Sequence, residues 1–271
     1  MSGIRLKYWR AVGAAAVVGL AAACGGEGGE GGSASEAGEG GEAGEAGASA
    51  PAPTPATATA PGGEGGPGGE AGAASAYAGV SGDQLTALRL AHLKGFVLAA
   101  DRVAAAGQTA EAGILVEQGV LEVYDIAADQ FGSLNVAIVR AAADGAPAHI
   151  DAAEAEIDRA ARALAEIDEA VLAARMVDIA TGLYQGVVQE DFVDAIEYQH
   201  SMGAALAAQA ALQAGQSALS AADADAYRDA SQQMTRFVGL WSHATAPEAP
   251  PAYRDVLAQA SRVRLALYPY F

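Results

Sequence analysis

The chain has 271 residues, of which 33 are Asp or Glu and 15 are Lys or Arg, so its formal net charge is −18. A chain this acidic repels phosphate instead of releasing counterions from it, which argues against a nucleic-acid partner. The one cysteine excludes an internal disulfide framework and a cysteine-rich zinc site. Aromatic residues make up only 6% of the chain, which argues against a large β-sandwich or barrel.

Residues 1–24 have the pattern of a bacterial secretory signal. The start is positively charged, because it contains Arg5, Lys7 and Arg10. The apolar stretch 11–23 that follows is too short to cross about 30 Å of hydrocarbon as a helix. Leu20 and three alanines then precede Cys24, which resembles a lipoprotein signal in which the cysteine is lipidated and becomes the mature N-terminus. An ordinary cleavable signal with an incidental cysteine is the alternative.

The residue after the cysteine bears on the location of the anchor. Gly25 stands there and Asp does not, which resembles the outer-membrane sorting pattern of enteric bacteria. We therefore expect a protein that is lipid-anchored on the periplasmic side of a bacterial membrane, with the outer membrane favoured over the inner. The expected partners are the membrane, through the anchor, and an envelope protein complex or a transporter.

Residues 25–76 are predicted to form a disordered tether rich in Gly, Glu and Pro. This stretch holds eighteen of the 34 glycines, five of the ten prolines, eight Glu and no Lys or Arg. Such a composition cannot bury enough apolar surface to offset the entropy of ordering. By the scaling of flexible linkers, about fifty residues span roughly 40 Å, so the tether would let a folded domain reach away from its anchor.

Residues 77–271 are predicted to form one all-α helical bundle, because apolar residues recur at helical spacing and no alternating strand pattern stands out. A first helix face runs from Leu85 to Val103 and ends at Gly107 in the C′ position. A second helix is expected over 110–130 and a shorter one over 134–143.

The second half continues the bundle. Pro147 suits a first helical position, and apolar residues from Ile150 to Ala174 then repeat as 3-4-3-4 along one long seam. Three further helix faces are expected, running from Phe192 to Gln213, from Tyr227 to Trp241, and from Tyr253 to Leu267.

Glu197 and His200 form the sharpest local motif. A Glu-x-x-His pair places both side chains on one helix face, as in carboxylate di-iron bundles. Asp191 and Asp194 precede Glu197 on roughly the same face, so these four residues are the candidate ligands of a metal ion, with iron the favoured metal. Di-iron sites use the motif twice, and here it occurs once. A solvated acidic face with one histidine is the alternative.

Other residues fit structural roles. His92 lies between apolar residues and is expected to be a hydrogen-bonded core residue. The widely spaced methionines, Met176, Met202 and Met234, are expected to fill the core, and Trp241 to anchor it. The aromatic end 268–271 is expected to pack on the bundle, with partner docking as the alternative. No nucleophile elbow, phosphate loop or dinucleotide fingerprint is present, so we expect no enzyme.

The stretch Asp178–Val188, with Phe192-Val193 and Glu197-Tyr198-Gln199, resembles the periplasmic helical region attached to bacterial iron permeases and the imelysin-like helical proteins. Upstream, the segments around His92, Gly107 and Glu122 resemble the same kind of protein. The resemblance implies a binding role in iron or other metal uptake.

The chain departs from that pattern at three places. Gln189-Glu190-Asp191 replaces the expected Asp-Gly turn, and two segments that carry histidines in similar proteins read Gly95-Phe96 and Glu117-Gln118-Gly119 here. Two hypotheses therefore stay open. One is a non-enzymatic lipoprotein with a helical binding or accessory domain linked to metal uptake. The other is a metal-free structural or interaction subunit of an envelope complex, and a hydrolase is a third class.

Overall fold

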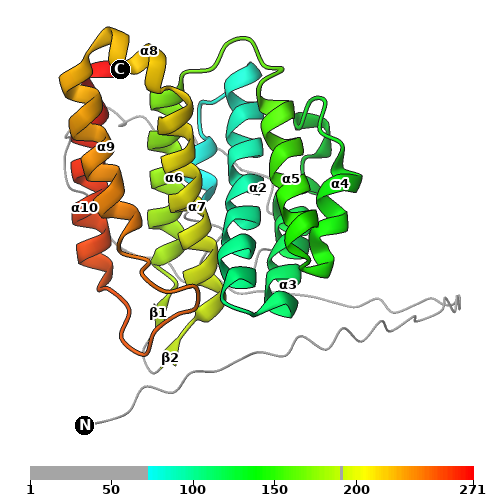
Figure 1. Cartoon of the computed structure of the whole chain (residues 1–271). Coiled ribbons are helices and arrows are strands. Elements are labelled where there is room, and N and C mark those ends of the chain that lie inside the picture. The colour runs from blue at the N-terminus through cyan, green and yellow to red at the C-terminus, as the bar shows by residue number, and fades with distance from the viewer. Residues whose placement is uncertain (1–72, 190–191) are drawn as a thin grey trace, which may run out of the picture. The chain divides into compact units, whose positions relative to one another are not determined.

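The structure is a computed structural model that describes residues 73–189 and 192–271 (Figure 1). The predicted signal, Cys24 and the predicted tether up to residue 72 lie outside the described residues. The described residues form helices and one very short hairpin, so the predicted all-α bundle is confirmed. Ala73 and Ala76 are buried against the bundle, which means that the packed residues begin before residue 77. Among the residues that the structure describes, every helix is too short or too polar to span a bilayer.

The helices are named in chain order as in Figure 1. They are α2 (Gly82–Ala105), α3 (Thr109–Gly119), α4 (Val136–Ala141), α5 (Pro147–Ala161), α6 (Glu169–Tyr184), α7 (Ala195–Ala214), α8 (Gln216–Ala222), α9 (Ala224–Val238) and α10 (Tyr253–Leu267). Short turns include η1 (Ser75–Tyr77), the π-helical η2 (Val120–Tyr124) and η5 (Tyr268–Tyr270). Strands β1 (Val188–Gln189) and β2 (Phe192–Val193) form an antiparallel hairpin between α6 and α7.

Helices α2 and α7 form the centre of the bundle (Figure 1). Helix α7 packs against α2, α6 and α9, while α2 also packs against α3 and α5. Helix α10 covers the outer side of α6 and α9. Both central helices are buried on several sides, so their faces are apolar nearly all round instead of forming one stripe.

The two central helices approach so closely because each has a glycine at their crossing. A Cβ atom on Gly95 would lie 3.0 Å from the carbonyl carbon of Gly203, and a Cβ atom on Gly203 would collide with the Gly95 carbonyl oxygen. Any side chain at either position would therefore push the helices apart. The glycines set the distance between the two halves of the bundle.

Several helix ends follow from local sequence. Asp168, Asp194 and Asp223 cap α6, α7 and α9 by accepting hydrogen bonds from backbone N–H groups of the first turn. Pro147 stands at the first position of α5, as predicted. Gly107 follows α2 with a φ of 86°, and its N–H donates to the Ala104 carbonyl, as expected for the glycine that ends a helix.

The single helix predicted over 110–130 is wrong. Helix α3 ends at Gly119 and widens into η2, where the Asp125 N–H bonds to the Val120 carbonyl at 2.8 Å. The chain then folds back, and Phe131 is buried with its ring 4.9 Å from that of Tyr124. Burial of this aromatic ring requires the turn that a continuous helix would not provide.

The long seam predicted from Ile150 to Ala174 is also interrupted. Helix α5 ends at Ala161 and α6 begins at Glu169. Contacts from the start of α2 hold the intervening turn. The Asp83 carboxylate accepts hydrogen bonds from two N–H groups of the turn, and the Gln84 amide bonds to both backbone polar groups of Asp168. Tertiary contacts thus override a helical repeat that continues across the break.

The helix face predicted from Phe192 starts late, since Phe192 lies in β2 and α7 begins at Ala195. In the hairpin, Val188 pairs with Val193 and Gln189 with Phe192. Strands of two residues are too short to show an alternating pattern, which explains why the sequence did not reveal them.

Candidate functional site

The predicted ligand Asp194 serves as the cap of α7. Its carboxylate accepts hydrogen bonds from the N–H groups of Ile196 and Glu197 at 2.9 and 3.2 Å, and its own N–H donates to the Val187 carbonyl. The hairpin therefore delivers this side chain to the helix N-terminus, where it neutralises unpaired N–H groups. The Oδ1 atom of Asp194 is therefore engaged in capping the helix. Asp191 lies outside the described residues.

His200 points into the interior of the bundle, one turn after Glu197. It is buried, its Nε2 lies 3.2 Å from the amide oxygen of Gln118, and its ring packs 4.6 Å from that of Phe96. Burial lowers the pKa of His200 to about 4, so the imidazole is neutral near pH 7. A hydrogen bond and an aromatic contact thus occupy this second predicted ligand.

Glu197 is half-buried beside the turn that follows α6. A Cβ atom added to Gly186 would meet the Glu197 Cγ at 3.4 Å, an ordinary van der Waals contact, so this turn and the glutamate are close neighbours. Within 73–189 and 192–271, no three His, Cys, Asp or Glu side chains gather as a group that could hold a metal ion. Of the predicted ligands, the structure places Asp194, Glu197 and His200 at the start of α7, where Asp194 caps the helix and His200 is hydrogen-bonded inside the bundle.

His92 is a hydrogen-bonded core residue, as predicted. Its Nδ1 lies 2.7 Å from the Tyr77 hydroxyl, and its ring packs 5.7 Å from Phe96. Burial, followed by the nearby His200 and Arg89, lowers the pKa of His92 to about 3. His92, Phe96 and His200 therefore form a row of rings inside the bundle, and both imidazoles are kept neutral.

Trp241 anchors the other side of the same interior. It is fully buried, its Nε1 donates to the Ser201 hydroxyl at 2.9 Å, and its ring meets Tyr184 and Phe237 edge to face. The Ser201 hydroxyl donates in turn to the Tyr198 carbonyl. The predicted core roles of the tryptophan and of the three methionines, all fully buried, are confirmed.

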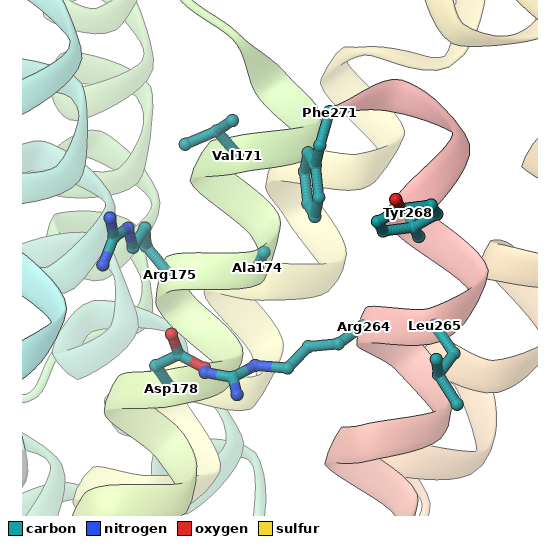
Figure 2. Close-up of a pocket in the computed structure, with 8 residues that line it drawn as sticks. All are labelled: Val171, Ala174, Arg175, Asp178, Arg264, Leu265, Tyr268 and Phe271. Atoms are coloured by element: carbon teal, nitrogen blue, oxygen red, sulfur yellow. The ribbon is translucent and has the colours of Figure 1, made fainter.

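A groove between α6 and α10 is a site that sequence reasoning missed. It encloses a cavity of about 450 Å³, in the size range of small-molecule pockets. Figure 2 shows Val171 and Ala174 on the α6 side and Leu265, Tyr268 and Phe271 on the α10 side. Most of the lining is apolar.

The C-terminal aromatic residues contribute to this groove instead of packing fully on the bundle. Tyr268 and Phe271 are 73% and 61% exposed, and Leu265 is 73% exposed. Only Tyr270 is tied down, because its hydroxyl donates to the Asp223 carbonyl at 2.7 Å. The segment 268–271 was predicted to pack on the bundle, and of its aromatic residues Tyr270 does so, whereas Tyr268 and Phe271 are exposed. The run of aromatic residues at this end was the one signal in the sequence for the groove.

Three charged groups line the same cavity. Arg264 of α10 reaches across the groove and forms an ion pair with Asp178 of α6, as Figure 2 shows. Arg175, one turn before Asp178, also lines the cavity, and no described carboxylate forms an ion pair with it. Burial, and then the positive charge of Arg175, lower the pKa of the Arg264 guanidinium. Figure 2 shows the Arg175 guanidinium pointing away from α10, so the charges that face each other in the groove are those of the Asp178–Arg264 ion pair.

A second hollow of about 270 Å³ continues the groove on the far side of the ion pair. It shares Asp178 and Arg264 with the first cavity and is otherwise lined by more polar side chains, including Thr181, Gln185 and Ser261. The ion pair therefore stands between an apolar and a polar section of one groove.

Comparison of the chain with protein-family models, with curated proteins and with solved structures finds no match. The resemblance to iron-permease and imelysin-like proteins thus rests on the short motifs in the sequence alone.

Proposed function

We propose that this protein is a membrane-anchored bacterial lipoprotein, lipidated at Cys24, whose helical domain is a non-enzymatic binding and accessory module on the periplasmic side. The groove between α6 and α10 is its binding place. The observation that carries this proposal is an open cavity of about 450 Å³ with a mostly apolar lining, bordered by the Asp178–Arg264 ion pair, on the outside of the bundle.

The predicted metal ligands are already engaged in other contacts, which favours the groove, and not a metal centre, as the binding place. The Asp194 carboxylate caps a helix, and the His200 ring is hydrogen-bonded and packed against an aromatic ring. The Oδ1 atom of Asp194 and the Nε2 atom of His200 are thus occupied, and a metal ion at either atom would cost the helix its cap or the core a hydrogen bond. The link to iron or other metal uptake stays a prediction from the resemblance.

An interaction subunit of an envelope complex is the second candidate. Ile114 of α3, Leu121 of η2 and Ile126 after it are 53%, 55% and 69% exposed. Ile114 and Leu121 are seven residues apart on the outer side of one continuous helical segment, so they lie on the same face. Exposed aliphatic side chains of this kind favour contact with another protein.

Native mass spectrometry of the full-length protein, extracted from the membranes of the bacterium that makes it, tests the leading proposal. The lipid on Cys24 is expected as a covalent mass increase, and a bound small molecule as a second increase lost on collisional activation. Ala174→Phe, which fills the cavity, is expected to lose only the second. A protein with no such ligand in either form would contradict the groove function, and an unmodified Cys24 would contradict the anchor.

Metal analysis of the same preparation separates the metal-uptake prediction from the groove. Our proposal expects less than about 0.1 equivalent of iron, copper or zinc, since its binding energy comes from apolar contact. One bound metal ion per chain that Glu197→Gln and His200→Gln both remove would instead support metal binding at the start of α7.

A further inference from the structure

The α6–α10 groove has an apolar section and a more polar section, and the ion pair between them carries no net charge. We infer that the groove binds an uncharged amphiphile, a molecule with an aliphatic chain and a hydroxylated, uncharged head group, and this inference rests on the proposed binding function. The chain would lie in the apolar section, and the hydroxyl groups would bond to the ion pair and extend toward the polar section. Such a ligand matches each part of the groove in turn.

The ion pair of Asp178 with Arg264 disfavours a charged head group. Figure 2 shows Arg264 reaching from α10 to Asp178 on α6, while the Arg175 guanidinium points away from α10. The two charges that face each other in the groove therefore neutralise one another. A carboxylate head would be repelled by Asp178 and an ammonium head by Arg264, unless it displaced the partner. A charged head would also lose hydration on entering the groove without gaining a counter-charge of its own.

A hydroxyl group is complementary to both members of this ion pair. The carboxylate of Asp178 only accepts hydrogen bonds and the guanidinium of Arg264 only donates them, whereas an alcohol does both. The Arg264 side chain is 53% exposed and that of Asp178 is 20% exposed, so each can be reached from outside. A diol can therefore bond to both groups without separating them.

The polar section has hydrogen-bonding capacity left for a head group. The Thr181 and Ser261 hydroxyls donate to carbonyl oxygens of their own helices at 2.7 and 2.9 Å, and each keeps lone pairs that can accept. The side chains of Gln185 and Tyr253 line the same hollow and form no hydrogen bond to another described residue. These four side chains are uncharged, so they offer hydrogen bonds to a head group but no counter-charge.

The apolar section favours an aliphatic chain. Val171 and Ala174 line it on α6, and Leu265, Tyr268 and Phe271 line it on the α10 side (Figure 2). The last three are each more than 60% exposed, so a chain lying against them would remove apolar area from water. A hydrophilic polyol such as glycerol could use the ion pair but not this surface, so the ligand needs both a chain and a head group.

Calorimetric titration of the chain from residue 24, with Cys24→Ser so that it carries no lipid, tests the inference without detergent. The probes share a ten-carbon chain and differ in the head group: 1,2-decanediol is uncharged, decanoate is an anion and decylammonium is a cation. Each is used below the concentration at which it aggregates. We expect the diol to bind at least about tenfold more tightly than either ion, and glycerol, which lacks the chain, to show no binding.

Variants of the ion pair show whether it selects the head group, because any apolar surface binds an uncharged amphiphile better than an ion. Asp178→Asn leaves Arg264 without its counter-charge and is expected to tighten decanoate binding about fivefold and to weaken diol binding about twofold. Arg264→Gln should instead tighten decylammonium binding about fivefold. Arg162→Gln, at the exposed end of α5, is the matched control and should change every affinity less than twofold.

Ala174→Phe separates the head-group assignment from the binding function itself. It fills the apolar section and is expected to abolish diol binding, whereas Ala155→Phe, at an exposed position of α5, should leave it unchanged. Ions that bind as tightly as the diol, or a preference that neither ion-pair variant changes, would overturn the assignment of an uncharged head group. Loss of binding in Ala174→Phe would then still support the groove as the binding place.

Sedimentation of the same chain tests the other occupant of such a surface, a second copy. The acidic bundle is expected to remain monomeric, because its copies repel one another. A dimer that Tyr268→Ser disperses, with no probe bound, would assign the groove to a second copy and overturn the inference. A monomer that binds none of the probes would overturn it too and count against the groove function as well.

Discussion

The crossing of α2 and α7 and the groove between α6 and α10 lie in the same alanine-rich bundle, but the surroundings of their polar side chains differ. At the crossing, glycine backbones touch, and each of the nearby buried groups His92, His200 and Trp241 has a hydrogen-bond partner. In the groove, large apolar side chains face water beside the Asp178–Arg264 ion pair, whose arginine is 53% exposed.

This contrast shows where chemistry is available in the domain. Polar groups in a close-packed interior must be satisfied within the protein, because burial without a partner is costly. Such groups carry structure and are not free to bind a ligand. The groove between α6 and α10 leaves apolar surface open to an external molecule. Perturbing each region should therefore affect different properties.

Acidification is expected to have the largest effect, and it acts on the interior. The folded-state pKa values of His92 and His200, about 3 and about 4, lie below the ordinary value of 6.5. Below pH 6.5 the two histidines bind protons in the unfolded chain but stay neutral in the folded chain. Their contribution to the free energy of unfolding is therefore fully present above about pH 6.5 and is lost as the pH falls toward 4. At pH 5 the two residues together should reduce the free energy of unfolding by about 4 kcal/mol.

Urea unfolding of the wild type and of His200→Gln at pH 7 and pH 5 measures this loss. The variant should lose about 2 kcal/mol less than the wild type between the two pH values. His243→Gln removes an exposed imidazole and is expected to behave as the wild type. An equal loss in wild type and His200→Gln would show that other groups dominate acid unfolding.

Gly203→Ala is expected to reduce the free energy of unfolding by about 3 kcal/mol, because its methyl group would collide with the Gly95 backbone. Chemical denaturation measures the change. Gly186→Ala is the matched control, since a Cβ atom there meets its nearest neighbour at an ordinary 3.4 Å. A loss below about 1 kcal/mol in Gly203→Ala would mean that the two helices can separate easily.

Ser201→Ala is expected to reduce stability by about 2 kcal/mol, because it leaves the buried Trp241 Nε1 without its acceptor. Trp241 is the only tryptophan after the predicted signal, so its fluorescence follows unfolding directly. Ser217→Ala, on the exposed side of α8, serves as the control. Equal midpoints for the two variants would show that the hydrogen bond contributes little.

Asp178→Asn is expected to have the smallest effect on stability, under about 1 kcal/mol, because the Arg264 side chain in this ion pair is 53% exposed. Thermal unfolding measures the change. A loss of more than about 1 kcal/mol would indicate that the ion pair contributes to the packing of α10 against α6.

Sequence periodicity was sufficient for the fold class and for most helix faces. Its errors lie at breaks that distant residues enforce. The turn between α5 and α6 depends on Asp83 and Gln84, more than eighty residues away, and the turn after η2 depends on burial of Phe131. Helical repeats of apolar residues continue through both places, so no local pattern reports the interruption.

The candidate site shows the same division. The sequence places Asp194, Glu197 and His200 at helical spacing, but the spacing does not tell whether a carboxylate caps the helix or a ring is buried. In the groove, Arg175 and Arg264 are 89 positions apart and share no motif. Only the packing of α10 against α6 brings them to one cavity.

Hydrophobic periodicity and the backbone preferences of neighbouring residues were enough to predict the all-α class, the inward position of His92, Trp241 and the methionines, and the helix ends at Gly107 and Pro147. The tertiary structure was needed to show which polar groups find partners in the interior and which side chains line an open groove. That outcome depends on contacts between segments far apart in the chain, and local sequence contains no record of them.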